Sequence, residues 1–130
     1  NRDQARLQDE EAKRQIETAR ARERAIAEIR QTADQQAIAR VRDLADARII
    51  TAAEAERRVG EIEQQGFDRR RAALNDEFLA AGANLQEQAR VNNEIIKLEA
   101  ERAAATEDTS RRVQAARPKL VSCCRNGSIC

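Results

Sequence analysis

Apolar residues recur at helical spacing through the first third of the chain. Ala5, Ala12, Ala19, Ile26 and Ala33 lie seven residues apart, which is the spacing of helices that pair along one face. Further apolar residues widen this stripe at spacings of three and four, namely Ile16, Ile29, Ala37, Val41 and Leu44. With no Gly or Pro to interrupt it, the pattern predicts one long amphipathic helix over 1–48. Ala buries little area, so we expect the first ~20 residues to fray or to depend on a partner.

The next segment, 49–51, has the features of a helix boundary. Thr51 followed by Glu54 fits a capping box, in which the hydroxyl accepts one free backbone N–H and the carboxylate accepts another. The adjacent Ile49 and Ile50 are β-branched and lower helix propensity slightly. Two interpretations are open, a break at this point or a continuous helix with a kink, since no Gly or Pro enforces the stop.

A second helix is predicted over 52–79, and it carries two glycines. Its larger apolar residues are Val59, Ile62, Phe67, Leu74, Phe78 and Leu79. Gly60 and Gly66 each cost up to ~1 kcal/mol relative to Ala inside a helix. Close approach of another helix would explain both glycines, and the alternative is that they mark a weak point.

The segment Ala80–Asn84 is predicted to be the turn of an antiparallel helical hairpin. Gly82 supplies a residue suited to the left-handed conformation that commonly follows a helix. Asn84 with Glu87 forms a second capping box. A third helix then runs over 85–116, and Pro118 ends it. The fold predicted is all-α: a long helix and then a helical hairpin (49–117) in an elongated, coiled-coil-like bundle.

A charge pattern supports the reversal at this turn. If the chain turns midway between Gly82 and Ala83, residues at equal distances from that point lie level on the two helices. Six levels then join opposite charges, and no level joins like charges: Glu54 with Arg111, Arg57 with Asp108, Arg58 with Glu107, Glu63 with Arg102, Asp68 with Lys97, and Arg71 with Glu94. Such a pattern disfavours slipped registers, although each exposed pair contributes only ~0–1 kcal/mol.

Composition and charge exclude several classes of function. Charged residues make up 36% of the 130 residues and aromatic residues only 2%, which is typical of long helices or coiled coils. A net charge of +1 gives no attraction to nucleic acid or to acidic membranes. No apolar run approaches the roughly 18 residues of a membrane span. We therefore predict no nucleic-acid partner and no membrane partner.

The C-terminal segment 118–130 differs from the rest of the chain. It holds the only Pro and all three cysteines, Cys123, Cys124 and Cys130. Three thiolates without a fourth ligand do not suit a zinc site. We expect a flexible tail, which is either native or an artefact of expression. A disulfide between chains and lipidation of the paired cysteines are the alternatives for these residues.

Candidate chemistry is sparse. The chain has no His, so histidine-based acid–base catalysis and histidine metal sites are excluded. Ser110, Ser122 and Ser128 have no base to activate them, and no Gly-rich phosphate loop occurs. Asn92 and Asn93 interrupt the third helix, either as buried residues that set its register or as exposed ones. We predict no catalytic, cofactor-binding or metal-binding residues, no cofactor, and no enzymatic activity.

Three runs of sequence resemble a known family. Residues 43–58 (DLADARIITAAEAERR), 67–74 (FDRRRAAL) and 95–103 (IIKLEAERA) are similar to the helical middle regions of tape measure proteins of tailed phages. The resemblance covers roughly residues 20–115 and lies in the amino-acid composition and in short stretches of similar sequence. It implies a structural protein inside a phage tail tube, which sets tail length and associates as a small oligomer.

Two functions follow from these patterns. The first is a structural or assembly protein of the tape measure kind, located in the virion, that forms homo-oligomers by helical packing and contacts tail tube proteins. The second is a coiled-coil interaction or oligomerisation module of a larger bacterial protein, located in the cytoplasm. The length of the parent chain and the oligomeric state separate the two.

Overall fold

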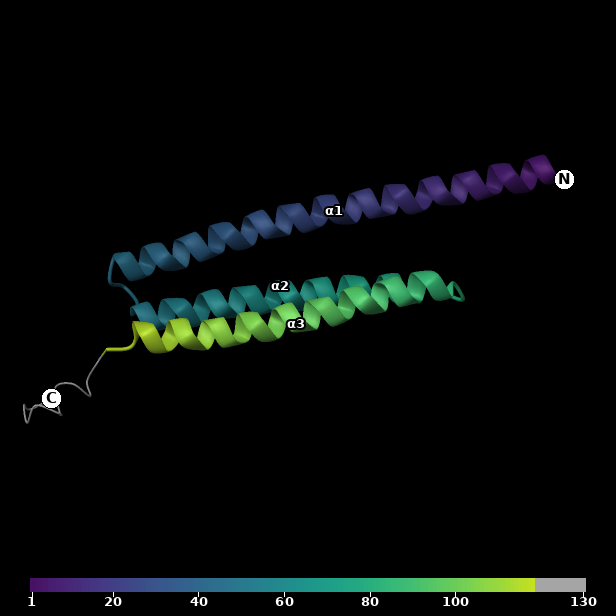
Figure 1. Ribbon diagram of the computed structural model, residues 1–130. Helices are drawn as coiled ribbons and strands as arrows, with labels where there is room; N and C mark the ends of the chain where they lie inside the picture. The colour runs from purple at the N-terminus through teal and green to yellow at the C-terminus, as the bar shows by residue number, and fades with distance from the viewer. Residues whose placement is uncertain (119–130) are drawn as a thin grey trace, which may run out of the picture. The chain divides into compact units, whose positions relative to one another are not determined.

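Three helices and no strands make up the described part of the protein. The computed structural model describes residues 1–118, and its helices are α1 (Arg2–Asp46), α2 (Ala52–Ala80) and α3 (Leu85–Ala116). Helices α2 and α3 are antiparallel and joined by a short turn (Figure 1). The predicted all-α fold, a long helix followed by a helical hairpin, is confirmed.

The contacts divide the chain into two units, and the boundary lies inside α1. The first unit is Asn1–Gln35, and the second begins at Gln36 and contains the end of α1 and the hairpin. Helix α1 has 45 residues and buries none of them. At a rise of 1.5 Å per residue it is about 68 Å long. In proteins most of the stability of a helix comes from packing of its apolar face, and α1 has no fully buried residue to contribute to such packing.

Helix α1 ends at a backbone conformation that no Gly or Asn in the sequence indicates. Arg48 has φ 60°, in the left-handed region that favours glycine. The N–H of Ile49 donates to the carbonyl of Leu44 at 2.9 Å, and the N–H of Arg48 donates to that of Ala45 at 3.0 Å. These two bonds are those of a Schellman motif. The helix therefore breaks here, and arginine holds the position that glycine usually takes.

Helix α2 begins at the predicted cap. The hydroxyl oxygen of Thr51 accepts the backbone N–H of Glu54 at 3.0 Å. The carboxylate of Glu54 binds Arg57 and Arg58, at 2.9 Å and 3.3 Å, instead of reaching back to the backbone of Thr51. Half of the predicted capping box is thus present, because two arginines one turn away compete for the carboxylate.

The hairpin turns at the predicted residues. The side-chain oxygen of Asn84 caps α3 by accepting the backbone N–H of Glu87 at 3.2 Å. Gly82 has φ 57°, which glycine adopts without strain. The carbonyl of Gly82 also accepts the side-chain amide of Gln88. The turn is therefore fixed by interactions within a few residues of sequence.

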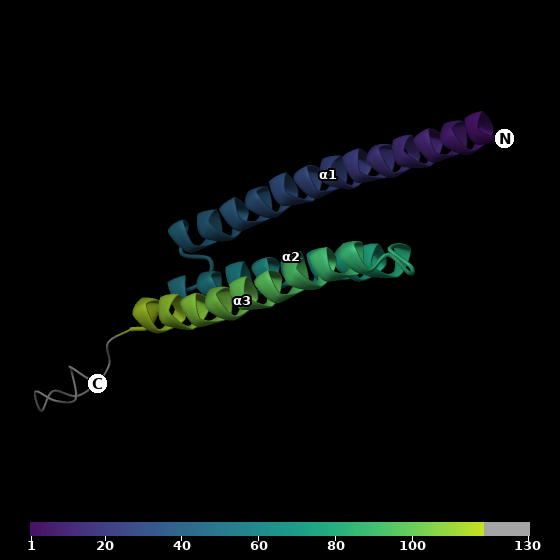
Figure 2. The same ribbon diagram turned by 45° about the vertical axis from the view of Figure 1, so that its right-hand side comes forward.

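Helices α2 and α3 pack along a seam with heptad spacing, and they lie side by side in both views of the ribbon (Figures 1 and 2). On α2 the seam contains residues seven apart that are buried or half-buried, namely Ala53, Gly60, Phe67 and Leu74. On α3 the corresponding series is Val91, Leu98, Ala105 and Arg112. Val59 and Val91 are the most completely buried large side chains, each 1% exposed. The apolar core of the hairpin is narrow and depends on a few well-buried residues.

One point of the seam brings the two helices very close. A Cβ on Gly60 would lie 2.4 Å from the Cγ2 of Thr109, which is closer than carbon atoms approach. The expectation that another helix approaches Gly60 closely is confirmed. A side chain at residue 60 would therefore require the side chain of Thr109, or α3 itself, to move.

Helix α3 ends before the proline. Arg117 has φ −69° and ψ 143°, the extended conformation that a following proline imposes. Asn92 and Asn93 are both exposed, so neither sets the register from inside the seam. The predictions for Cys123, Cys124 and Cys130 concern residues 119–130, which lie outside the described residues.

Candidate functional site

The seam of the hairpin combines apolar layers with charged layers. Half-buried carboxylates lie on α2, and half-buried or partly exposed arginines lie on α3. The acidic set is Glu56, Glu63 and Glu77, and the basic set is Arg90, Arg102 and Arg112. Ion pairs of the opposite sense also cross the hairpin, from Arg70 to Glu101 and from Arg71 to Glu99, so charges of both signs on each helix favour the pairing of α2 with α3.

Arg112 is the centre of the largest charge cluster. Its guanidinium binds Glu56 at 2.8 Å and Glu63 at 2.9 Å, both across the hairpin. It also pairs with Asp108 one turn earlier on α3 and donates to the hydroxyl of Thr109 at 3.4 Å. The side chains of Arg112, Glu56 and Glu63 are 28%, 22% and 29% exposed. One arginine thus binds three carboxylates beside the close approach at Gly60.

The surroundings of Arg112 stabilise its charged form. Burial of the guanidinium acts to lower the pKa of Arg112, but the charge of Glu63 and the hydrogen bonds to Glu56 and Glu63 raise this pKa overall. A planar guanidinium with several donors is suited to binding carboxylates on two sides at once. Arg112 is therefore a permanent cation that joins carboxylates of both helices.

A second polar group lies nearer the turn. Arg102 binds Asp68 at 2.6 Å and donates to the side-chain oxygen of Gln64 at 2.8 Å. The amide nitrogen of Gln64 then donates to the hydroxyl of Thr106 at 3.0 Å. Phe67 lies under the guanidinium of Arg70, with 4.6 Å between the guanidinium carbon and the ring centre. The contacts of Arg102 and Gln64 connect α2 to α3, and the contact of Arg70 with Phe67 lies within α2.

The ion pairs across the hairpin are displaced from the six predicted levels. Arg102 pairs with Asp68 rather than with Glu63, and Asp68 lies five residues closer to the turn. Arg71 pairs with Glu99 at 3.0 Å rather than with Glu94, five residues farther from the turn. Helical side chains lean toward the N-terminus of their own helix, so in an antiparallel pair the charged ends meet at displaced positions. Among the described residues, none of the six predicted pairs forms an ion pair.

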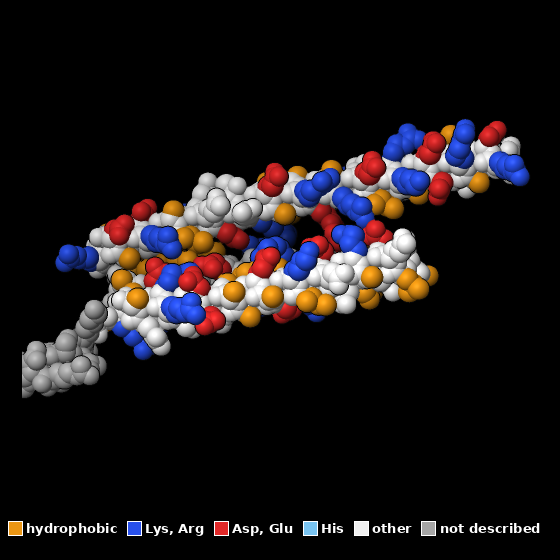
Figure 3. Space-filling view, in the orientation of Figure 1, with side chains coloured by type: hydrophobic (Ala, Val, Ile, Leu, Met, Phe, Trp, Pro, Cys, Tyr) orange, Lys and Arg blue, Asp and Glu red, His pale blue; other side chains and the backbone are white. Residues whose placement is uncertain are grey.

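The turn end of the hairpin presents an apolar surface, which we call the tip and define as Phe78, Leu79 and Leu85. These side chains are 38%, 77% and 76% exposed. Figure 3 shows apolar side chains gathered at the end of the hairpin that carries the turn. No charged residue occurs in 78–86. The tip is thus an uncharged surface on a chain that is otherwise densely charged.

Carboxylates surround the tip. Arg90 binds Glu87 at 3.2 Å and Glu77 at 3.4 Å. The hydrogen bond to Glu87 is the main cause that raises the pKa of Arg90. Burial of the guanidinium opposes this shift, and the charges of Glu87 and Glu77 add to it. One arginine is therefore shared by two carboxylates, and Asp76 is exposed nearby.

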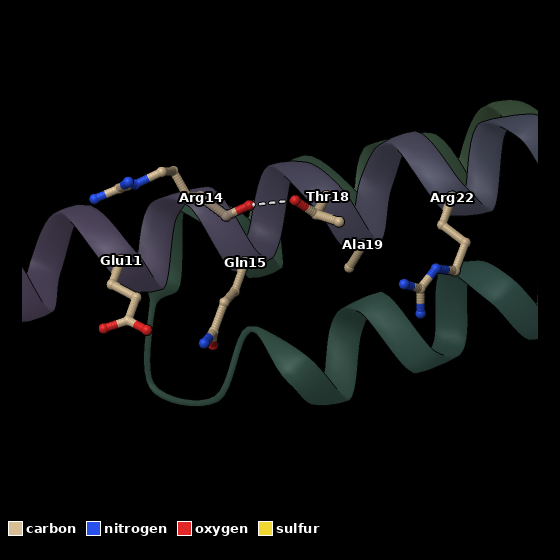
Figure 4. Close-up of a pocket in the computed structure, with 6 residues that line it drawn as sticks. All are labelled: Glu11, Arg14, Gln15, Thr18, Ala19 and Arg22. Carbon is tan, nitrogen blue, oxygen red and sulfur yellow. Dashed lines mark hydrogen bonds between the residues drawn. The ribbon is translucent and has the colours of Figure 1, made fainter.

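The large apolar residues in the first 30 residues of helix α1 are exposed. Leu7, Ile16, Ile26 and Ile29 are between 41% and 69% exposed. Charged side chains of both signs lie along the same helix (Figure 3). The pocket drawn in Figure 4 is lined by residues of α1 alone, and within it the hydroxyl of Thr18 donates to the carbonyl of Arg14 at 2.9 Å. Because one helix supplies every residue, these side chains form a surface strip.

The chemical capacity of the described residues is for binding by packing and charge. Within 1–118, no group of three or more Cys, Asp or Glu side chains has the arrangement to hold a metal ion. No described helix has the length and apolar character needed to cross a membrane. No site residue was predicted from the sequence, and the Arg112 cluster was missed. The spacing of Val91, Leu98, Ala105 and Arg112 was the available signal.

The chain consists of a helix without buried residues and a hairpin whose two helices pack against each other. It was compared with known proteins. No family model, no curated protein and no solved structure matches it.

Proposed function

We propose that this chain is a helical segment of a structural or assembly protein, of the tape measure kind, that acts by packing its helices against other chains. The observation that carries the proposal is the complete absence of buried residues in the 45-residue helix α1. A helix of this length with an apolar stripe is stable when a partner covers the stripe.

The partner proposed for α1 is a second copy of the chain. Ala5, Ala12 and Ala19 place small side chains along one face, and small side chains permit close approach of two helices. Ile16 and Ile26, 51% and 41% exposed, supply the larger apolar surface. In a tail, the same elongated helices would lie against tube proteins, so the virion is the proposed location.

A second candidate is a coiled-coil module of a larger bacterial protein, which acts in the cytoplasm. The observation that favours it is the self-sufficient hairpin, with caps at Thr51 and Asn84 and a core around Val59 and Val91. A hairpin of this kind is suited to act as a rigid spacer. The coding sequence on either side discriminates the two: many hundreds of residues of similar helical arrays favour a tape measure, and a distinct second domain favours the module.

The experiment that tests α1 as the association surface compares matched Ile variants of the full chain. Ile16→Ser with Ile26→Ser removes the larger apolar residues of the stripe. Ile96→Ser is the control, because Ile96 is 59% exposed on α3 and outside α1. Sedimentation equilibrium at about 0.5 M salt, where contacts between surface charges are screened, should give an oligomer for the wild type and the control, and a monomer for the α1 variant. Circular dichroism should show helix content that rises with concentration in the wild type. A wild type that is monomeric at every concentration refutes the proposal.

A further inference from the structure

We propose that the hairpins of different copies associate head to tail, with the apolar tip of one copy and the carboxylates that flank it docked on the basic opposite end of the next. We call that opposite end the base and define it as residues 48–58 and 107–117. The proposal deepens the structural role given above, and it uses a surface that the association through α1 does not use.

The tip provides the apolar part of the contact. Leu79 and Leu85 each expose about three quarters of their surface, 77% and 76%. Exposed apolar side chains that are contiguous and surrounded by polar groups mark interaction surfaces. At the base, Ile49 is 70% exposed and offers an apolar residue to receive them.

Charge separates the two ends of the hairpin. Around the tip, residues 72–93 contain Asp76, Glu77 and Glu87 against Arg90 alone, a net charge of −2. At the base, six arginines stand against the four acidic residues Glu54, Glu56, Glu107 and Asp108, a net charge of +2. The dipoles of two antiparallel helices oppose each other at each end, so the side chains decide the sign. Like ends repel and unlike ends attract.

The local pairing reinforces this difference. At the tip two carboxylates, Glu77 and Glu87, share Arg90. At the base Arg57 and Arg58 share Glu54, whereas Arg112 is bound by three carboxylates. Arg48 and Arg117 are exposed and have no ion-pair partner among residues 1–118. The base thus presents the exposed arginines Arg48 and Arg117, and the exposed Asp76 lies beside the tip.

The charge pattern selects a second copy as the occupant. A tip-to-tip contact would bring two acidic surfaces together, and an acidic membrane surface would repel the tip for the same reason. A tip-to-base contact is heterologous, and a heterologous contact that does not close generates an open chain of subunits. The apolar surface involved is small, so the association is weak and falls with salt, because surface charges are screened beyond about 8 Å at physiological ionic strength.

The test uses full-length chains that all carry Ile16→Ser and Ile26→Ser, so that association through α1 does not contribute. The tip variant adds Leu79→Ser and Leu85→Ser. The base variant adds Arg48→Asp and Arg117→Glu, and Asp is chosen because it tolerates the positive φ of Arg48 better than most residues. Ile96→Ser and Lys97→Glu, at exposed positions midway along α3, are the matched controls.

Sedimentation velocity at about 20 mM salt, where screening is weak, should show a mass that rises with concentration for the background and for both controls. The tip variant and the base variant should each be monomeric, with association at least tenfold weaker. Mixed in equal amounts, they should form a dimer and no larger species, because the mixture has one intact tip and one intact base. Addition of about 0.5 M salt should dissociate it.

Three outcomes would overturn the proposal. The first is a background that stays monomeric at low salt. The second is a base variant that still self-associates, which indicates tip-to-tip contact. The third is a mixture of the two variants that stays monomeric. A result in which the α1 variant abolishes all association refutes only the head-to-tail contact. If the head-to-tail contact is observed but Ile16→Ser with Ile26→Ser does not change the association of the otherwise wild-type chain, only the role of α1 is refuted.

Discussion

Gly60 and Thr109 meet at the closest point of the hairpin, where a Cβ on Gly60 would lie 2.4 Å from the Cγ2 of Thr109. Thr109 is held in place, because its hydroxyl donates to the carbonyl of Ala105 at 3.0 Å and it is β-branched. The threonine therefore has little freedom to move aside, and the spacing of α2 and α3 at this level is set by a glycine.

Replacement of Gly60 by Ala should destabilise the protein despite the better helix propensity of Ala. Overpacking costs about 1–3 kcal/mol and the propensity returns up to ~1 kcal/mol, so a net loss of about 1–2 kcal/mol in the free energy of unfolding is expected. Urea denaturation measures it.

The matched second variant for this site is Thr109→Ala. Combined with Gly60→Ala it removes the clashing methyl group and should recover most of the loss, with a coupling of at least ~1 kcal/mol. Thr106→Ala, one turn away and exposed, should give no recovery. Equal losses in both double variants would show that the contact does not set the helix spacing.

Arg112→Ala should destabilise the hairpin more than the same change at the neighbouring residue. It leaves Glu56, Glu63 and Asp108 without their shared cation, and hydrogen bonds between charged groups, discounted for partial exposure, suggest a loss of about 1–2 kcal/mol. Arg111→Ala is the control, because Arg111 is 72% exposed and pairs with Glu107 alone. It should cost at most ~0.5 kcal/mol. Similar midpoints of urea unfolding for the two variants would contradict the central role of Arg112.

Arg48→Gly should stabilise the protein, although it removes a charged side chain. Arg48 has φ 60°, and a residue with a Cβ pays about 1–2 kcal/mol in that conformation. Part of this gain is lost to the greater freedom of glycine in the unfolded chain, so a rise of about 0.5–1 kcal/mol is expected. Thermal unfolding followed by circular dichroism measures it.

The control for Arg48→Gly is a glycine of the same conformation with open space around it. Gly82 has φ 57°, and a Cβ at this residue would have no neighbouring atom within 4 Å. Gly82→Ala should therefore lose about 1 kcal/mol through backbone strain alone. A neutral Gly82→Ala, or a destabilising Arg48→Gly, would indicate that the backbone relaxes at these positions.

Glu54 should contribute stability that disappears in acid. Hydrogen bonds from Arg57, then from Arg58, lower the pKa of Glu54, although burial opposes the shift. A carboxylate with a lowered pKa in the folded state stabilises above its unfolded pKa, and this contribution is lost as the pH falls through the folded pKa. The difference in unfolding free energy between the wild type and Glu54→Gln should therefore be present at pH 7 and vanish below the usual carboxylate range.

The arginines provide the control for this pH dependence. Arg57→Gln with Arg58→Gln removes the groups that lower the pKa of Glu54, and in that background Glu54→Gln should show a smaller dependence on pH. Denaturation curves at several pH values measure both differences. A difference between the wild type and Glu54→Gln that is constant across the acid range would contradict the assignment.

The sequence by itself determined the helices and the turn, because the interactions that end a helix act over a few residues. Thr51, Asn84, Gly82 and Pro118 each act on their own backbone or on that of close neighbours, and the predicted bounds of α2 and α3 agree with the structure to within one residue. The tertiary structure alone decided which charges pair. Arg102 and Arg112 occupy seam positions, and the lean of side chains in antiparallel helices displaces Arg102 to Asp68 and Arg71 to Glu99. These features depend on the rotation and spacing of whole helices, which no local pattern specifies.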